Sequence, residues 1–157
     1  GLGAKGEAEL RKFAEAGGRL VFLNDSSLYA AGHLGVKVKN VLNGVPNREF
    51  YCPGSLLKVR LDAASPLTYG MPGEFAVWME QSPVWEPEDP SIKPAARYAD
   101  TGVLDSGWLL GEKLIAGKPA VIEVPIGAGR AVLFGFRPQY RAQSYLTMKM
   151  LFNALVQ

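Results

Sequence analysis

The last thirty residues constrain the fold of this chain most strongly. A glycine-containing turn at 127–129 precedes an apolar strand at 130–136, and Arg137-Pro138-Gln139 marks a sharp corner. Residues 142–156 then read as a helix that is apolar almost all round, with one side formed by Tyr145, Met148, Phe152 and Leu155. Helices of this kind are buried on more than one side. We therefore predict that this strand, corner and helix form the unit against which the rest of the chain packs.

The beginning of the chain predicts a helix, a strand and a second helix. Residues 7–16 carry apolar side chains at helical spacing, and Gly17-Gly18 provides a helix end. The run 19–23 is nearly continuous in apolar residues, which is typical of a strand covered on both faces of a parallel sheet. Residues 28–34 fit a short helix. This alternation predicts a layered α/β fold.

Residues 35–105 have a different character, and we expect them to form a β-rich, mostly antiparallel insertion or lobe within one domain that spans 1–157. Residues 83–94 hold four prolines and are expected to be an exposed loop. Short strands are predicted around this loop, at 36–42, 57–61, 75–79 and 95–99, and residues 106–115 read as a turn or helical corner. Residues 119–124 and 130–136 flank a turn and predict a hairpin.

Composition excludes several classes of partner. The chain has 17 basic and 15 acidic residues, and the basic residues are dispersed rather than gathered on one segment. We therefore predict no nucleic-acid partner. No apolar run approaches the roughly 18 residues that cross a bilayer, so no membrane span is expected. A hydrophobic content of 48% is sufficient for one sizeable core.

Polar residues follow two of the predicted strands and suggest a ligand cleft. Asn24, Asp25 and Ser26 follow the first strand, and Arg137 and Gln139 follow the last one. Ligands of open α/β sheets bind at the carboxyl ends of strands, where Arg137 could hold a carboxylate. The alternative is structural: Asp25 or Ser26 caps a helix, and Arg137 ties a loop.

The sequence offers few residues that could act together as a nucleophile and its base. Cys52 and Ser26 are candidate nucleophiles, and His33 is the only imidazole that could serve as their base. Neither residue two places from Ser26 is glycine, as a nucleophile elbow would require. One histidine and one cysteine, far apart in sequence, do not make a zinc site. We expect no catalytic residues, no metal and no cofactor, with a degenerate hydrolase that uses Cys52 or Ser26 with His33 as an alternative.

A third hypothesis is a carbohydrate-binding module. Its binding surface would be aromatic, and the candidate residues are Trp78, Trp85, Trp108 and Tyr98. Aromatic side chains also dominate ordinary cores and interfaces. The sequence does not place these four residues together.

Several stretches resemble the C-terminal domain of large bacterial zinc carboxypeptidase-like proteins. The resemblance covers most of the chain and ends with Leu151-Phe152-Asn153-Ala154-Leu155. Its other motifs are Leu10-x-x-Phe13-x-x-x-Gly17-Gly18-Arg19-Leu20-Val21, Phe50-Tyr51-Cys52-Pro53-Gly54-Ser55-Leu56-Leu57, Ser106-Gly107-Trp108-Leu109-Leu110-Gly111-Glu112 and Gly135-Phe136-Arg137-Pro138-Gln139-Tyr140-Arg141-Ala142-Gln143.

The resemblance implies a three-layer, flavodoxin-like sandwich similar to class I glutamine amidotransferases. It also implies an exported parent, periplasmic or extracellular, in which a peptidase domain lies upstream and carries the zinc ligands. The elbow position holds Asn24-Asp25-Ser26-Ser27 where amidotransferases have cysteine, and no late His-x-Glu follows. We therefore expect a non-catalytic accessory domain that packs on the peptidase domain or assists substrate binding. We also expect a sheet that lacks its first strands, with an exposed edge through which two copies could pair.

Overall fold

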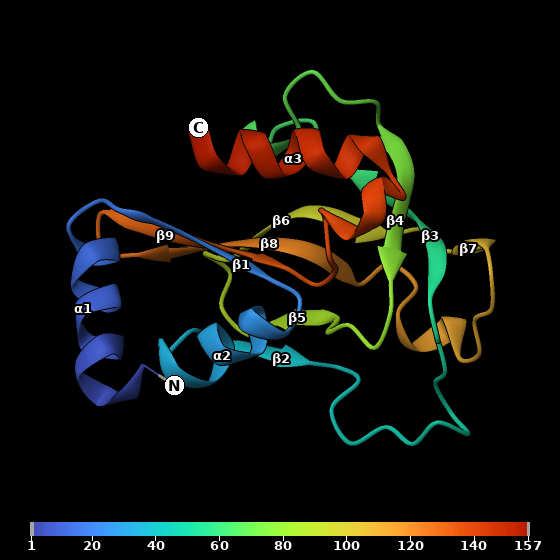
Figure 1. The fold of residues 1–157 in the computed structure, drawn as a ribbon, viewed down its shortest axis with the longest axis horizontal. Helices are drawn as coiled ribbons and strands as arrows, with labels where there is room; N and C mark the ends of the chain where they lie inside the picture. The colour runs from blue at the N-terminus through green and yellow to red at the C-terminus, as the bar shows by residue number, and fades with distance from the viewer. Residues whose placement is uncertain (1, 157) are drawn as a thin grey trace.

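The computed structural model describes residues 2–156, and a seven-stranded sheet forms its centre (Figure 1). Its strands follow the spatial order β1-β9-β8-β6-β3-β4, and β7 pairs with β3 off this path. Among these described strands, β1 and β9 run parallel and the other neighbours are antiparallel. The strands are β1 (Arg19–Leu23), β3 (Ser55–Leu61), β4 (Glu74–Met79), β6 (Lys93–Tyr98), β7 (Leu104–Ser106), β8 (Pro119–Ile126) and β9 (Gly129–Phe134).

Both faces of the sheet are covered (Figure 1). On one face lie α1 (Gly3–Glu15), α2 (Asp25–His33) and a two-stranded sheet made of β2 (Val38–Asn40) and β5 (Trp85–Pro87). The other face is covered by α3 (Tyr145–Val156) together with the short helical turn at Pro66–Thr68. Further short helical turns span Glu112–Leu114 and Tyr140–Ala142.

The alternation of side chains along the strands divides the core into two clusters. On the α1 and α2 face, Leu20, Phe22 and Leu133 are buried with Ala14 and Ala30. On the α3 face, the buried strand residues Val121, Val132 and Phe134 belong to the cluster that contains Met150 and Ala154 of α3. Because both faces are buried, β8 and β9 are apolar almost throughout.

Several sequence predictions are confirmed. The first strand has the predicted bounds, 19–23, and it pairs in parallel with β9. The predicted hairpin is formed by β8 and β9. The first helix begins at Gly3 rather than at residue 7, and α2 begins at Asp25, earlier than the predicted 28. The predicted strands at 57–61, 75–79 and 95–99 correspond to β3, β4 and β6.

The predicted exposed loop at 83–94 is wrong in its first half. Residues 85–87 form β5, which pairs with β2, and the Trp85 side chain is fully buried. The Asn40 side chain holds this segment in place, because its Oδ1 accepts a hydrogen bond from the Val84 amide (3.0 Å). The prolines did indicate irregular backbone, but they did not indicate the burial of the tryptophan between them. The predicted turn or helical corner at 106–115 includes the last residue of β7, and the helical turn at 112–114 lies within it.

The β-rich segment 35–105 contributes most of its strands to the central sheet. Strands β3, β4, β6 and β7 extend the sheet beyond β8, and only β2 and β5 form a separate pair among the described strands. The strand order ends at β1 on one side and at β4 on the other.

The final helix is less buried than its sequence predicts. The buried side of α3 consists of Thr147, Met150, Asn153 and Ala154. The opposite side, with Tyr145 and Phe152, is exposed to solvent. The apolar pattern all round the helix therefore does not reflect packing on two sides within this chain.

The turn of the β8–β9 hairpin meets the end of α1 through backbone atoms. The Ala128 amide donates to the Glu15 carbonyl oxygen (3.1 Å), and the Arg130 amide donates to the Gly18 carbonyl oxygen (3.2 Å). A Cβ atom at Gly127 would lie 2.6 Å from Glu15 Cα, and one at Gly129 would lie 2.1 Å from the Gly18 oxygen. Only glycine fits at these two positions.

Candidate functional site

The parallel pairing of β1 and β9 brings the polar residues after each strand to the same edge of the sheet. The Asn24 amide, directly after β1, donates to the Phe134 carbonyl oxygen at the end of β9 (2.9 Å). The Ser27 hydroxyl donates to the same oxygen (2.8 Å). These two bonds tie the start of α2 to the last residue of β9.

Asn24 occupies a strained turn between a strand and a helix. Its backbone angles are φ 49° and ψ −117°, and only 3% of the residue is exposed. In nucleophile elbows, a turn of this kind presents the attacking side chain to the substrate. Here the side chain is an amide, whose Nδ2 donates to Asp25 Oδ1 (3.1 Å) and whose Oδ1 is buried without a partner in the part of the chain that is described. The turn has an elbow conformation but no nucleophile.

Ser26 folds back onto the strand that precedes it. Its hydroxyl donates to the Leu23 carbonyl oxygen (2.8 Å) and accepts from the Leu23 amide (2.7 Å). The predicted side-chain capping by Asp25 or Ser26 is wrong, since the N-cap of α2 is Asn24 and forms no side-chain cap bond. The hydroxyl is committed to holding the turn.

Arg137 joins the loop after β9 to the end of β4. Its Nη1 donates to Glu80 Oε2 (2.9 Å), and its guanidinium carbon lies 5.9 Å from the centre of the Tyr140 ring. Tyr140 in turn stacks on Trp78, with ring centres 4.9 Å apart. Gln139 is exposed, and no hydrogen bond connects Asn24 to Arg137 within residues 2–156. The arrangement fits the structural alternative, in which Arg137 ties a loop.

The candidate nucleophiles and the histidine are not brought together. Cys52 is buried, its thiol donates to the Met79 carbonyl oxygen (3.4 Å), and burial raises the pKa of this thiol. His33 Nδ1 lies 3.1 Å from Glu7 Oε1, and the imidazole stacks on Tyr29. The side-chain contacts of Cys52, Ser26 and His33 are therefore separate, and none of the three contacts another.

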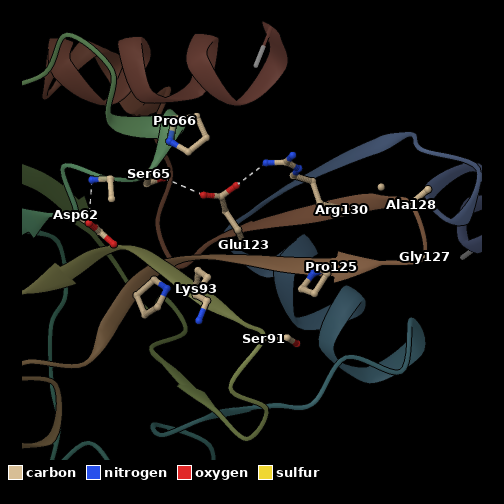
Figure 2. A pocket seen from close by; sticks show the side chains of 13 residues that line it. Asp62, Ser65, Pro66, Ser91, Lys93, Glu123, Pro125, Gly127, Ala128 and Arg130 are labelled. Carbon is tan, nitrogen blue, oxygen red and sulfur yellow. Dashed lines mark hydrogen bonds and ion pairs between the residues drawn. The ribbon is translucent and has the colours of Figure 1, made fainter.

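A pocket of about 550 Å³ lies on the α3 face of the sheet, at the start of β9 (Figure 2). Its most buried charged group is Glu123, whose side chain is 13% exposed. Glu123 accepts a hydrogen bond from the Ser65 hydroxyl (2.8 Å) and another from Arg130 Nη1 (3.2 Å). Figure 2 shows Glu123 between these two residues. The remaining lining includes the rings of Pro66, Pro94 and Pro125.

Arg19 adds a second guanidinium beside this pocket. It is the direct cross-strand neighbour of Arg130, and its Nη1 donates to the Ala154 carbonyl oxygen in the last turn of α3 (3.2 Å). Burial, and secondly the charge of Arg130, lowers the pKa of Arg19, while Glu123 acts in the opposite direction. Its Nε is buried without a partner among the described residues. One carboxylate thus balances two guanidiniums.

Sequence reasoning missed this pocket. The available signal was a charged residue, Glu123, inside the apolar run 119–126, together with arginines at or near the first positions of two strands. The pocket has the size and the polar lining of a small-molecule site. Its Ser65 hydroxyl is hydrogen-bonded to the Glu123 carboxylate, which Arg130 also contacts, and no imidazole lines the pocket among the described residues.

The four aromatic residues of the carbohydrate-binding hypothesis do not form a shared exposed surface. Trp85 and Tyr98 are fully buried, Trp78 stacks on Tyr140, and only Trp108, with 64% exposure, presents its ring to solvent among these four. Residues 2–156 contain no group of three side chains able to hold a metal ion. Over the same residues, no helix combines the length and apolar character needed to cross a bilayer.

No protein-family model and no curated protein matches the chain. Solved structures do match it. A β-galactosidase from Bacillus circulans sp. alkalophilus has 12% identity and a TM-score of 0.56, over 96% of this chain and 20% of the galactosidase. A GMP synthase protein from Thermoplasma acidophilum has 14% identity and a TM-score of 0.59, over 96% of this chain and 63% of that one.

A ThuA-like protein from Bacteroides uniformis is similar over 97% of this chain and 62% of its own, with 14% identity and a TM-score of 0.52. At such identities the likeness shows the fold alone. The chain spans about a fifth of the galactosidase and less than two thirds of the other two proteins. The chain has a mixed α/β fold with a mostly open sheet, and it shares that fold with parts of these three proteins.

Proposed function

We propose that this chain is a non-catalytic accessory module with a three-layer, amidotransferase-like fold, and that it belongs to a larger hydrolase. The observation that carries the proposal is the turn at Asn24. Its strained backbone has the elbow conformation, but it presents a buried amide where an amidotransferase needs a nucleophile. Backbone strain is common at active sites, but the amide side chain at this strained residue is buried and is not a nucleophile.

The sequence resemblance to the C-terminal domain of zinc carboxypeptidase-like proteins supports a peptidase as the larger enzyme, and with it a periplasmic or extracellular location. The three solved structures described above are a β-galactosidase, a GMP synthase protein and a ThuA-like protein, and none of them is a carboxypeptidase. Their support is more general, because the same fold occupies 20% of a β-galactosidase chain. In either setting the module packs on the catalytic part, and the pocket at Glu123 and Arg130 assists the binding of substrate.

Assays with the purified chain test the absence of catalysis. We expect no release of ammonia from glutamine and no hydrolysis of p-nitrophenyl acetate above the buffer rate. Activity that is lost in Cys52→Ala or in Ser26→Ala would overturn the proposal in favour of the degenerate hydrolase. Activity that both variants retain, and that persists through a second purification by a different method, would also overturn the proposal, because it would require another nucleophile such as Ser65 beside Glu123.

The accessory role makes a second prediction for the parent polypeptide. Removal of this module should leave kcat of the hydrolase nearly unchanged, and it should raise KM or lower thermal stability. A loss of kcat with unchanged KM and unchanged stability would contradict an accessory role, because it would place chemistry in the module.

A further inference from the structure

Helix α3 presents an apolar stripe to solvent that no described part of the chain covers. Tyr145, Phe152 and Leu155 are 81%, 61% and 60% exposed, and Met148 between them is half-buried. We call these four residues the α3 seam. Contiguous apolar surface of this kind is rare on monomers and marks an interaction site.

The spacing of the α3 seam indicates what kind of surface covers it. The intervals from 145 to 148, to 152 and to 155 are three, four and three residues, which is the a/d pattern of a coiled-coil heptad. A helix that packs on a sheet or a broad core usually carries a wider apolar stripe. The narrow pattern is suited to a second helix.

We infer that the α3 seam pairs with the same seam of a second copy of this chain, in an antiparallel dimer with two-fold symmetry. In this arrangement Met148 of each copy meets Phe152 of the other, and Tyr145 meets Leu155. A thioether beside an aromatic ring is a favourable contact. A parallel pair would instead place Phe152 against Phe152, and it would align the two helix dipoles unfavourably.

The exposed area is sufficient for such a dimer. Val156, which is 78% exposed, extends the seam at its C-terminal end. Since large aromatic side chains bury 150–250 Å² each, Tyr145, Phe152, Leu155 and Val156 would bury on the order of 500 Å² per copy, or about 1,000 Å² in total, which is the least that a specific interface needs.

Charge does not oppose the pairing. Lys149 is the only charged residue of α3, and it lies outside the seam, with its Nζ near Gly70. No charge would therefore be buried at the centre of the interface. This surface is distinct from the open edge of the sheet at β1, and the inference does not depend on the accessory role proposed above.

Sedimentation velocity over a wide range of concentration tests the dimer. We expect reversible dimerisation of the wild-type chain, and at least a tenfold weaker dimer for Phe152→Glu, which places a charge in the seam. The matched control is Trp108→Glu, at an equally exposed apolar residue far from α3 in sequence, which should dimerise like the wild type. A monomeric wild-type chain at all concentrations, or equal weakening by both variants, would overturn the inference.

Thermal unfolding and circular dichroism distinguish the loss of the dimer from unfolding of the variant. Because Phe152 is exposed in the single chain, Phe152→Glu should leave the monomer folded, with an unchanged circular dichroism spectrum. Should this variant unfold instead, Leu155→Gln, a milder polar change at another exposed seam position, provides the same comparison.

Cross-linking tests the orientation. In a Cys52→Ala background, one chain carries Met148→Cys and the other carries Phe152→Cys. Antiparallel pairing predicts that oxidation of the mixture yields mainly the disulfide between the two different chains. Disulfides formed mainly between identical chains would contradict the antiparallel arrangement, because only parallel helices bring the same position of both copies together.

Discussion

Arg19 and Ala154, separated by 135 positions in sequence, are joined by a hydrogen bond of 3.2 Å from the guanidinium to the carbonyl oxygen. This bond satisfies one of the last carbonyl groups of α3, which have no partner within the helix. It also places a positive charge at the negative end of the helix dipole. The first strand therefore helps to hold the last helix on the sheet.

We predict that Arg19→Met destabilises the chain by about 1.5–3 kcal/mol, the usual range for the loss of a hydrogen bond that involves a charged group. Urea unfolding measures this loss. The control is Arg48→Met, because the Arg48 side chain is largely exposed and its nearest acidic partner lies 3.8 Å away. Equal effects of the two substitutions would show that the contact with α3 contributes nothing.

Glu123→Gln should destabilise the chain by about 1–2 kcal/mol, because glutamine keeps the shape but loses the charge that Arg130 and Ser65 contact. The neighbouring Arg19 and Arg130 would then repel each other without a compensating carboxylate. We expect the loss to be larger at low salt than at high salt.

Glu88→Gln is the control for this electrostatic effect, since Glu88 pairs with Lys39 at an exposed site. Exposed ion pairs contribute at most about 1 kcal/mol. The prediction fails if Glu123→Gln costs no more than Glu88→Gln in unfolding experiments at low ionic strength.

The elbow at Asn24 predicts an unusual order of stability between two substitutions. Asn24→Ala loses the amide and keeps a Cβ atom at φ 49°, whereas Asn24→Gly loses the amide and relieves the backbone. We therefore expect the glycine variant to be more stable than the alanine variant by about 1 kcal/mol.

The same pair of substitutions at Ser26 provides an internal control of opposite sign. Ser26 lies within α2, where glycine is less stable than alanine by roughly 0.5–1 kcal/mol. If alanine is the better replacement at both positions, the strain at Asn24 does not contribute to stability.

Cys52 predicts how stability depends on alkaline pH. Burial raises the pKa of this thiol, so the folded state keeps a proton that the unfolded state releases near its ordinary pKa of about 8.5. The contribution of this thiol to stability should therefore be constant below that pH and decrease as the pH rises from there towards the folded-state pKa. The raised pKa of the buried Tyr98 acts in the same direction at higher pH.

Two measurements check this pH dependence. Cys52→Ala should reduce the loss of stability between neutral and alkaline pH, and it should leave the part that comes from Tyr98. Iodoacetamide should modify native Cys52 much more slowly at neutral pH than the same cysteine in urea. Rapid stoichiometric labelling of the native chain at neutral pH is incompatible with a buried, protonated thiol.

The local sequence predicted those elements in which propensity and packing agree. The run 19–23 is apolar on both faces because both faces of β1 are covered, and two apolar runs around a glycine turn gave the β8–β9 hairpin. By contrast, Trp85 stands among prolines, and its burial depends on Asn40, more than forty residues away. Local pattern carries no information about such a contact.

The candidate sites were also predicted only in part, because some of their contacts join segments that are distant in sequence. The sequence placed Asn24 and Arg137 after strands, and the parallel pairing of β1 with β9 accounts for their shared edge. It did not reveal the contact of Arg137 with Glu80 or the group formed by Glu123, Ser65 and Arg130. Ser65 and Glu123 are 58 positions apart in sequence, and Arg137 and Glu80 are 57 apart, so no local pattern indicates either contact.

The joint between the β8–β9 turn and the end of α1 is built from glycines and main-chain atoms, so its geometry does not depend on side-chain identity. Homologues could exchange almost every surrounding side chain during evolution and still keep this joint, provided that the two glycines persist. At Gly127 and Gly129, amino-acid substitution during evolution is restricted by the space available and not by the chemical properties of a side chain.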